Sequence, residues 1–454
     1  MASSTAARRR LRSFLRWMTS WGIQISDGLE IVEGVNNGIS CGEFGVRAAY
    51  DFQDGDAIAF IPKDACLTLR TTGAAHTLDK AQLGGGLGLV VALMYERSRG
   101  EASPWFPYLN LLPLRHGALP IVWEREEIDA LLLGTELHLV AMEDRRLMEE
   151  DWRECIWPLT EVYSNEFPKE HFTLEHYLSA KTLVASRSFE VDDFHGYGMV
   201  PLADLFNHKT SKEDVHIMRE ADSDLPQKRI NFGRASPEVE SDCLGPSRVE
   251  EISDGDSHSP LESAKGKERS DVLEMVLIRD VSGGSEIFNT YGELSNACLL
   301  HRHGFTETDN RYDIVNIDFT LVMYYSASFF PKRHVRNRVR LWRKYGCSAL
   351  RWKTTEYFEI EQERATVISS GKSRDLGGVF LTAQVCEALL WLSERRDEAY
   401  GQTSLEEDLE LLDVVNPVEE PKLFHALSLR ISERSILKRL YHFSREKLGT
   451  PQKM

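Results

Sequence analysis

The sequence predicts a mixed α+β fold in which strand-rich stretches alternate with long helical ones. Three observations support this prediction. Residues 30–70 combine apolar runs with frequent glycines, which is the pattern of strands and turns. Residues 76–185 carry apolar side chains at helical spacing, and helical spacing dominates again after residue 310. Shorter extended segments over 197–218 and 272–278 separate the two helical stretches.

The chain begins with a predicted helix. Phe14, Leu15 and Met18 fall on one helical face and lead into the fold at Trp21, so we expect a helix from about residue 11. The residues before it look dispensable. Their arginines and serines, without acidic residues, also fit an organelle transit peptide, but the continuous apolar face favours a helix that belongs to the fold.

Turn signals place the next elements. Asp54-Gly55 predicts a turn before a strand at 58–62. The glycines at 84–86 lack the spacing of a dinucleotide-binding loop and are expected to open a helix. A strand over 272–278 is followed by a turn at Ser282-Gly283-Gly284.

Residues 219–270 break the pattern. They hold 12 acidic and 8 basic residues but only 8 large aliphatic or aromatic ones. Such a segment buries too little apolar surface to offset the entropy of ordering it. We therefore expect a disordered surface loop inside a domain.

Composition and charge narrow the class of protein. The chain has 454 residues, of which 42% are hydrophobic and 28% charged, as in an ordinary globular protein. Its longest apolar run, Leu87–Tyr95, is far shorter than the roughly 20 residues of a membrane span. The net charge of −17 argues against nucleic-acid binding and suits a basic protein partner, although many proteins are acidic for solubility alone. Seven cysteines without CxxC spacing predict neither disulfides nor a thiolate zinc site.

Three motifs carry candidate chemistry. The first, 41–46, is a glycine-rich turn between strands, which is either a plain turn or a place where backbone approaches a ligand. The second, 199–208, ends in Asn207 and His208, which either cap a turn or face a polar ligand. The third, 287–292, places Tyr291 after a strand, as an edge aromatic or a positioned hydroxyl. No metal-ligand spacing and no GxSxG elbow accompanies them.

The order of these motifs resembles that of the SET-domain protein lysine methyltransferases, specifically the Rubisco-methyltransferase-like group. The resemblance covers nearly the whole chain and looks closest to the branch that methylates ribosomal proteins and transcription factors. The matching segments are 14–25, Gly45-Val46, 103–109, Leu112-Pro113, 186–189, 200–208, 289–296 and 303–305.

The resemblance implies a β-rich SET fold with a pseudoknot, interrupted by a helical insert and followed by an α-helical substrate-docking domain. The implied boundaries are 11–75 for the first part of SET, 76–185 for the insert, 186–309 for the second part and 310–454 for the C-terminal domain. The pseudoknot would cross the segment at Asn207 with the strand near Tyr291.

The resemblance also implies the activity and its residues. The reaction would be methyl transfer from S-adenosylmethionine to a lysine side chain, with no metal. Tyr291 would be catalytic. The cofactor would contact Gly42, Glu43, Phe44, Arg187, Asn207, His208 and His303, and the substrate would contact Asp204, Tyr291 and Phe305. The sequence departs from many relatives at His303-Gly304-Phe305, where they have Tyr-Gly-Phe.

The chemistry fits such a site. Methyl transfer is an in-line displacement, so positioning supplies much of the rate. The lysine nucleophile must be neutral although its free pKa is about 10.4, and a desolvated channel lowers that pKa. Two alternatives stay open: methylation of histidine by the same group, and a catalytically weak SET module that binds proteins.

The expected partner is a protein with an accessible lysine, such as a ribosomal, nuclear or other basic protein, and not a membrane or nucleic acid. We expect a monomer in the nucleus, the cytoplasm or both, with a plastid as a lesser possibility.

Overall fold

A computed structural model describes residues 2–33, 44–114, 117–218, 271–329, 331, 350–352, 357–361 and 383–449. The chain divides into two compact units. The first comprises Met1–Gly117, Asp144–Arg234 and Pro246–Gly292, and the second comprises Ala118–Glu143, Ala235–Gly245 and Glu293–Met454. The predicted disordered loop, 219–270, lies outside the described residues.

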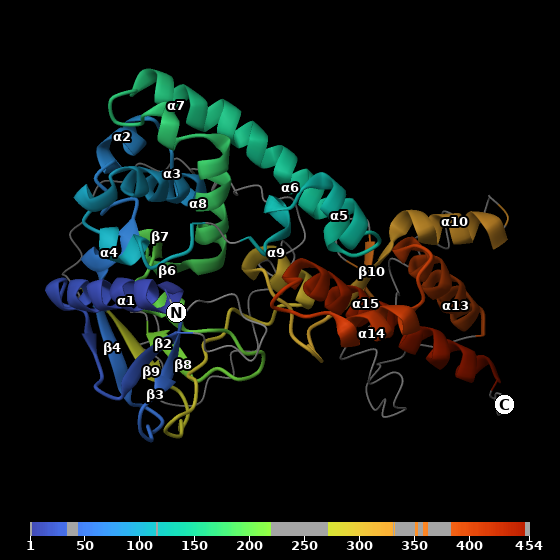
Figure 1. The fold of residues 1–454 in the computed structure, drawn as a ribbon. Helices are drawn as coiled ribbons and strands as arrows, with labels where there is room; N and C mark the ends of the chain where they lie inside the picture. The colour runs from blue at the N-terminus through green and yellow to red at the C-terminus, as the bar shows by residue number, and fades with distance from the viewer. Residues whose placement is uncertain are drawn as a thin grey trace, which may run out of the picture. The chain divides into compact units, whose positions relative to one another are not determined.

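The first unit combines short antiparallel sheets with helices (Figure 1). Its helices are α1 (Ala2–Ser20), α2 (Ala75–Lys80), α3 (Gly85–Ser98), α4 (Phe106–Leu109), α7 (Trp157–Val162) and α8 (Leu174–Arg187). Its strands are β1 (Gln24–Ile25), β2 (Leu29–Glu33), β3 (Phe44–Ala48), β4 (Ala57–Pro62), β5 (Leu67–Thr68), β6 (Ser188–Asp192), β7 (Gly196–Met199), β8 (Val215–Met218) and β9 (Val272–Leu277). The predicted α+β class is confirmed.

Three sheets make up the β part of the first unit. Their strand orders are β1-β4-β9-β8, β2-β3 and β5-β7-β6, and every pair is antiparallel. In β9 the side chains of Leu273, Met275 and Leu277 are buried and alternate with more exposed neighbours, the period of a strand with one core face. The predicted turns at Asp54-Gly55 and Gly283-Gly284 and the helix opening at Gly85 are present.

Helix α1 packs an aromatic face against the rest of the first unit. Phe14, Trp17 and Met18 are buried, and the Trp17 indole donates a hydrogen bond to the Pro104 carbonyl at 2.7 Å. The Trp17 ring stacks at 6.2 Å on the ring of Tyr108. The helix begins at Ala2, earlier than expected, and Ala7 is also buried.

The second unit is helical around one small sheet. Its helices are α5 (Arg125–Leu131), α9 (Asn296–His303), α10 (Phe319–Phe329), α13 (Ala383–Asp397), α14 (Leu405–Val414) and α15 (Pro421–Gly449), and its strands are β10 (Ile314–Asp318), β11 (Leu350–Trp352) and β12 (Tyr357–Glu361). Helix α6 (Leu137–Asp151) starts in this unit and ends in the first. Among the described residues, no helix is long and apolar enough to cross a membrane.

The stretch after residue 310 is mostly helical, as expected, but it also contains a small sheet that the sequence did not predict. Strand β12 pairs with both β10 and β11 in antiparallel register. In β10 only Val315 and Ile317 are fully buried, an alternation too short to stand out beside the longer helical patterns. Its partner β12 lies some 40 residues further along the chain, so local periodicity does not reveal the pairing.

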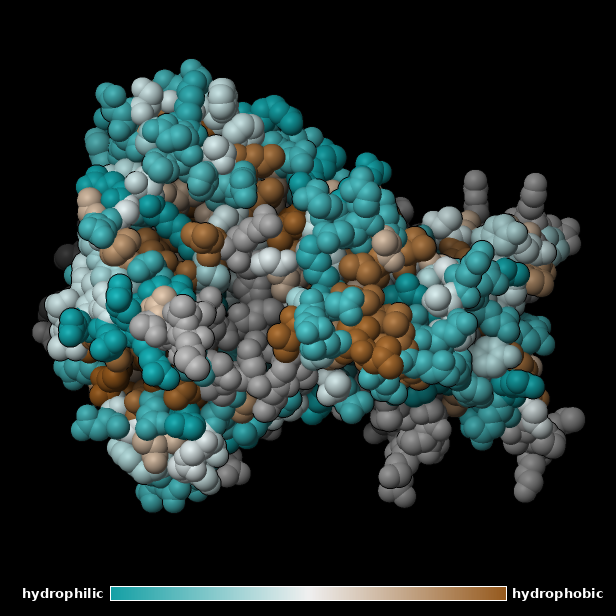
Figure 2. Space-filling view, in the orientation of Figure 1, coloured by the Kyte–Doolittle hydropathy of each residue, from teal (hydrophilic) through white to brown (hydrophobic). Residues whose placement is uncertain are grey.

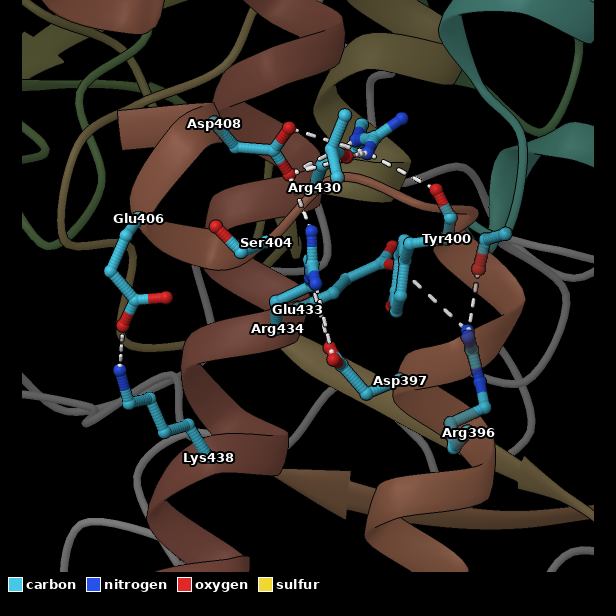
Figure 3. Close-up of polar contacts among 12 residues, drawn as sticks. Arg396, Asp397, Tyr400, Ser404, Glu406, Asp408, Arg430, Glu433, Arg434 and Lys438 are labelled. Atoms are coloured by element: carbon cyan, nitrogen blue, oxygen red, sulfur yellow. Dashed lines mark hydrogen bonds and ion pairs between the residues drawn. The ribbon is translucent and has the colours of Figure 1, made fainter. Parts of the chain in front are cut away.

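Paired charges fill the space between α13, α14 and α15 (Figure 3). The Arg434 guanidinium lies between Asp408, at 2.8 Å, and Asp397, at 2.9 Å. Arg430 contacts Asp408 at 3.3 Å, and the Tyr400 hydroxyl donates to Glu433 at 2.6 Å. Buried charges of this kind are tolerated because each has an opposite charge or a hydrogen-bond partner.

The surface of the second unit also carries exposed apolar side chains. Figure 2 shows hydrophobic residues gathered over α14 and α15. Leu409, Leu411 and Val414 of α14 are exposed large apolar side chains. Scattered surface leucines and valines are normal, so these alone identify no partner.

Gly134 is a position where only glycine fits. Its φ is +79°, and a Cβ there would lie 2.5 Å from the Ala399 backbone oxygen. Its own carbonyl accepts a hydrogen bond from Arg396 at 2.8 Å.

We expect Gly134→Ala to destabilise the second unit by about 2–4 kcal/mol, because backbone strain adds to a clash with backbone atoms. Gly86→Ala is the matched control, since a Cβ at Gly86 meets nothing within 4 Å and alanine favours a helix. Chemical unfolding followed by circular dichroism compares the two. Equal midpoints for both variants would contradict the clash at Gly134.

Candidate functional site

Two distant segments of the first unit run side by side and form the centre of the site. His208 and Asn289 form a parallel β-bridge. The Asn289 amide donates to the Asn207 carbonyl at 2.8 Å, and the Lys209 amide donates to the Asn289 carbonyl at 3.3 Å. The third and second sequence motifs therefore meet, as the resemblance implied for the pseudoknot.

This pairing places Tyr291 on His208. Their rings stack with centroids 5.0 Å apart. The Tyr291 backbone N–H donates to His208 Nδ1 at 2.9 Å, so the neutral imidazole carries its proton on Nε2, which lies 3.1 Å from the Thr210 hydroxyl. The ring of His208 is thus held in one orientation and one tautomer.

The Tyr291 hydroxyl points back along the same segment. It donates to the Phe206 carbonyl at 3.2 Å. Burial raises the pKa of Tyr291 to about 12, with a smaller opposing effect from the nearby Arg187 charge. The phenol is therefore protonated at neutral pH and offers a donor and acceptor oxygen rather than a base.

Asn207 contacts a residue that the sequence did not single out. Its side-chain amide donates to Glu286 Oε1 at 2.6 Å. Burial raises the pKa of Glu286, and the bond from Asn207 opposes this effect. The sequence feature that could have indicated Glu286 is an acidic residue within the strand-like run before Tyr291.

Asp204 and Arg187 form the buried polar end of the site. Arg187 Nη1 donates to the Asp204 backbone carbonyl at 2.8 Å and lies 3.6 Å from Asp204 Oδ2. The Tyr108 hydroxyl donates to the same Oδ2 at 2.9 Å. Tyr108 belongs to the matching segment 103–109 but was not predicted as a site residue.

The Asp204 carboxyl is entirely buried, and its surroundings change its ionisation. Burial raises the pKa of Asp204 to about 6, with the Arg187 charge and the Tyr108 hydroxyl opposing the rise. The chain reaches Asp204 through Leu202, which holds a positive φ of 75° that bulky residues rarely adopt. A strained turn therefore presents this carboxyl.

The remaining predicted residues fall in three places. Phe44 is buried at the start of β3, while Gly42 and Glu43 lie outside the described residues. His303 ends α9 in the second unit, and its ring centroid lies 6.3 Å from that of Phe305. The cofactor role of His303 and the substrate role of Phe305 stay predictions.

Asn296, the last polar residue of the third motif, has a structural part in the second unit. Its amide nitrogen donates to the Glu307 carbonyl and to Asp313, and its amide oxygen accepts from the Glu307 N–H. These bonds tie the start of α9 to the chain that follows it.

Two buried atoms at the polar end of the site have no hydrogen-bond partner among the described residues. They are Arg187 Nε, a donor, and Asp204 Oδ1, an acceptor. Atoms of this kind cost stability unless a ligand or water satisfies them. Arg187 Nε could donate to a carboxylate and Asp204 Oδ1 could accept from an amine, so the two atoms suit a ligand that has both groups. The described residues contain no cluster of His, Cys, Asp and Glu that could hold a metal ion.

Comparison with solved structures decides the fold. The SET domain of LSMT bound to lysine and AdoHcy matches with a TM-score of 0.61 and 18% identity, covering 97% of this chain and 92% of that one. Rubisco LSMT bound to AdoMet matches over the same shares with a TM-score of 0.59. The chain therefore has a SET-domain fold like that of Rubisco LSMT.

Sequence relatives of this SET-domain protein agree. It is 28% identical over 364 residues to ribosomal lysine N-methyltransferase 3 of Saccharomyces cerevisiae, a match over 67% of this chain and 63% of the relative. It is 26% identical over 378 residues to N-lysine methyltransferase setd6 of Danio rerio, over 79% and 68% of the two chains. The match thus spans just under two thirds of the yeast relative. No family model matches the chain.

We expect Asp204→Asn to change the pH dependence of stability. The raised pKa of Asp204 means that the native state binds this proton more tightly than the unfolded chain, so ionisation destabilises the fold at neutral pH and this cost disappears as pH falls through about 6 toward 4. The asparagine variant lacks the cost. Its unfolding free energy relative to the wild type should rise by about 2 kcal/mol between pH 4.5 and 7.5.

Chemical unfolding at several pH values across that range measures the difference. A difference that is the same at every pH would show that the Asp204 carboxyl is not buried as described.

Proposed function

We propose that this SET-domain protein is an S-adenosylmethionine-dependent protein-lysine N-methyltransferase. The observation that carries the proposal is the Tyr291 hydroxyl held at the Phe206 carbonyl, with its ring stacked on His208. Both relatives above bear the name of lysine methyltransferases, and the matching solved structures were bound to AdoMet or to lysine and AdoHcy. These likenesses support the same assignment.

The residues present fit the cofactor. The methionine part of S-adenosylmethionine has a carboxylate and an amine, which suit the unpartnered Arg187 Nε and Asp204 Oδ1 respectively. We assign cofactor contacts to Arg187, Asn207, His208 and Phe44, as the resemblance implies. When bound, S-adenosylmethionine supplies an electrophilic methyl group on a sulfonium. Because Asp204 was predicted to face the substrate, its free oxygen is equally suited to a substrate amine.

Tyr291 and the adjacent backbone would orient the nucleophile. A lysine amine has N–H groups that need acceptors, and the Tyr291 oxygen and the Phe206 carbonyl are two neighbouring acceptors. Holding both N–H groups leaves the nitrogen lone pair free in a fixed direction, which is the main requirement of an in-line displacement. Tyr291 does not take the proton, because its raised pKa keeps the phenol protonated. The apolar surroundings that raise this pKa would also favour the neutral amine.

We propose a basic protein, such as a ribosomal or nuclear one, as substrate. The net charge of −17 favours such a partner. We propose that the chain acts as a monomer in the nucleus, the cytoplasm or both.

The decisive experiment is transfer of a labelled methyl group to proteins of a cell extract, followed by mass spectrometry of the labelled residue. Methyl-lysine is the expected product. Methyl-histidine as the product would show histidine methylation instead of the proposed reaction. Absence of label despite measurable cofactor binding would favour a protein-binding module.

We expect Tyr291→Phe to reduce turnover by about 10²-fold or more, because the amine loses one of its two acceptors and its orientation. Affinity for S-adenosylmethionine, measured by calorimetry, should change by less than about threefold, since the backbone N–H to His208 remains. Tyr197→Phe is the matched control because Tyr197 is 58% exposed. Unchanged turnover in Tyr291→Phe would remove Tyr291 from the mechanism.

A further inference from the structure

Helix α1 displays a row of arginines that the proposed activity does not use. Its 19 residues include five arginines and neither lysine nor an acidic residue. Arg8, Arg12 and Arg16 are spaced four residues apart and Arg9 lies beside them, so the four fall within about 100° of one side of the helix over about 12 Å. We call Arg8, Arg9, Arg12 and Arg16 the arginine face.

The arginine face is open to solvent and its charges are not neutralised. All four side chains are exposed. Among the described residues none of them forms an ion pair with a carboxylate, and the Arg12 Nε only donates to the Arg8 carbonyl of the same helix at 3.3 Å. Four like charges side by side repel one another, so such a face is stabilised by binding an anion.

The opposite side of α1 limits what this helix can bind. Phe14, Trp17 and Met18 are buried against the first unit, with Trp17 bonded to the Pro104 carbonyl. An amphipathic helix that binds a membrane must insert its apolar face between lipids, and this face is already occupied.

The composition of the exposed side favours a nucleic acid over a protein. Ser13, Thr19 and Ser20 complete it, and no large apolar side chain is exposed there. Figure 2 shows hydrophilic residues over much of the α1 surface in view. Protein partners usually need an aromatic or aliphatic anchor at the centre of an interface, whereas nucleic-acid interfaces are polar and positively charged.

We propose that the arginine face of α1 binds the phosphate backbone of single-stranded RNA. Guanidinium groups pair with phosphates through two parallel hydrogen bonds, and their spacing of about 6 Å along the helix lets a flexible strand present successive phosphates to them. A rigid duplex curves away from a short straight row. These contacts involve only the phosphates of the RNA, so binding is independent of base sequence.

This proposal revises the expectation, drawn from net charge, that the chain makes no contact with nucleic acid. A net charge of −17 is a sum over the whole chain. At about 0.1 M salt, charges more than about 10 Å away are largely screened, so the local row of arginines dominates what an anion experiences at α1.

Fluorescence anisotropy of a labelled oligouridylate with the full chain tests the proposal. Four neutralised phosphates on a single strand predict a slope of about −2.8 for log affinity against log salt, which is a loss of about 50-fold between 50 and 200 mM NaCl. Arg12→Gln with Arg16→Gln should weaken binding by about tenfold or more and reduce the slope by about 1.4. Glutamine is also a good helix former, so α1 stays helical, as circular dichroism will verify.

The matched control is Arg125→Gln with Arg153→Gln, which removes the same charge from exposed positions outside α1. It should leave affinity and slope unchanged. Equal weakening by both pairs, or no binding at 50 mM NaCl, would overturn the proposal. Tighter binding of poly-glutamate would assign the face to an acidic protein, and equal binding of duplex DNA would contradict the choice of a single strand.

Discussion

The candidate site depends on one interaction, the parallel pairing of the segment around His208 with the segment around Asn289. These segments lie some 80 residues apart in sequence. Bringing them together costs chain entropy, which contacts between sequence neighbours cannot offset. Backbone hydrogen bonds between Asn207, Lys209 and Asn289 fix the register of the pairing. A different register would move Tyr291 away from His208 and from the Phe206 carbonyl, so both contacts of Tyr291 follow from this pairing.

The charged cluster between α13, α14 and α15 and the polar end of the candidate site differ in how their buried atoms are partnered. In the second unit, Arg434 lies between Asp397 and Asp408, and Arg430 also contacts Asp408, so the charges balance within the fold. In the first unit, Arg187 and Asp204 are buried together with one atom of each left unpartnered among the described residues. Arg439 Nε and Nη2 of the second unit are also buried without a partner among the described residues. The open atoms of Arg187 and Asp204 therefore support a ligand there only together with the contacts around Tyr291.

The same principle applies on the surface. Most described salt bridges join a basic residue to a carboxylate of the same helix or of another element in the same unit. The arginine face of α1 has no carboxylate partner among the described residues. The helix can carry these charges because its aromatic side, with Phe14 and Trp17, is firmly packed. One side of α1 therefore packs against the first unit, and the opposite side carries the exposed charges.

The sequence alone determined the α+β class, the turns at Asp54-Gly55 and Gly283-Gly284, the helix opening at Gly85, and the resemblance that singled out Asn207, His208 and Tyr291. These features rest on local conformational preference and on residue order, which a linear chain displays directly. Only the tertiary structure decided that Glu286 contacts Asn207, that Tyr108 reaches Asp204, and that β12 pairs with β10. Each of these joins residues distant in sequence, and such contacts depend on how buried polar groups find partners after the chain has folded back on itself.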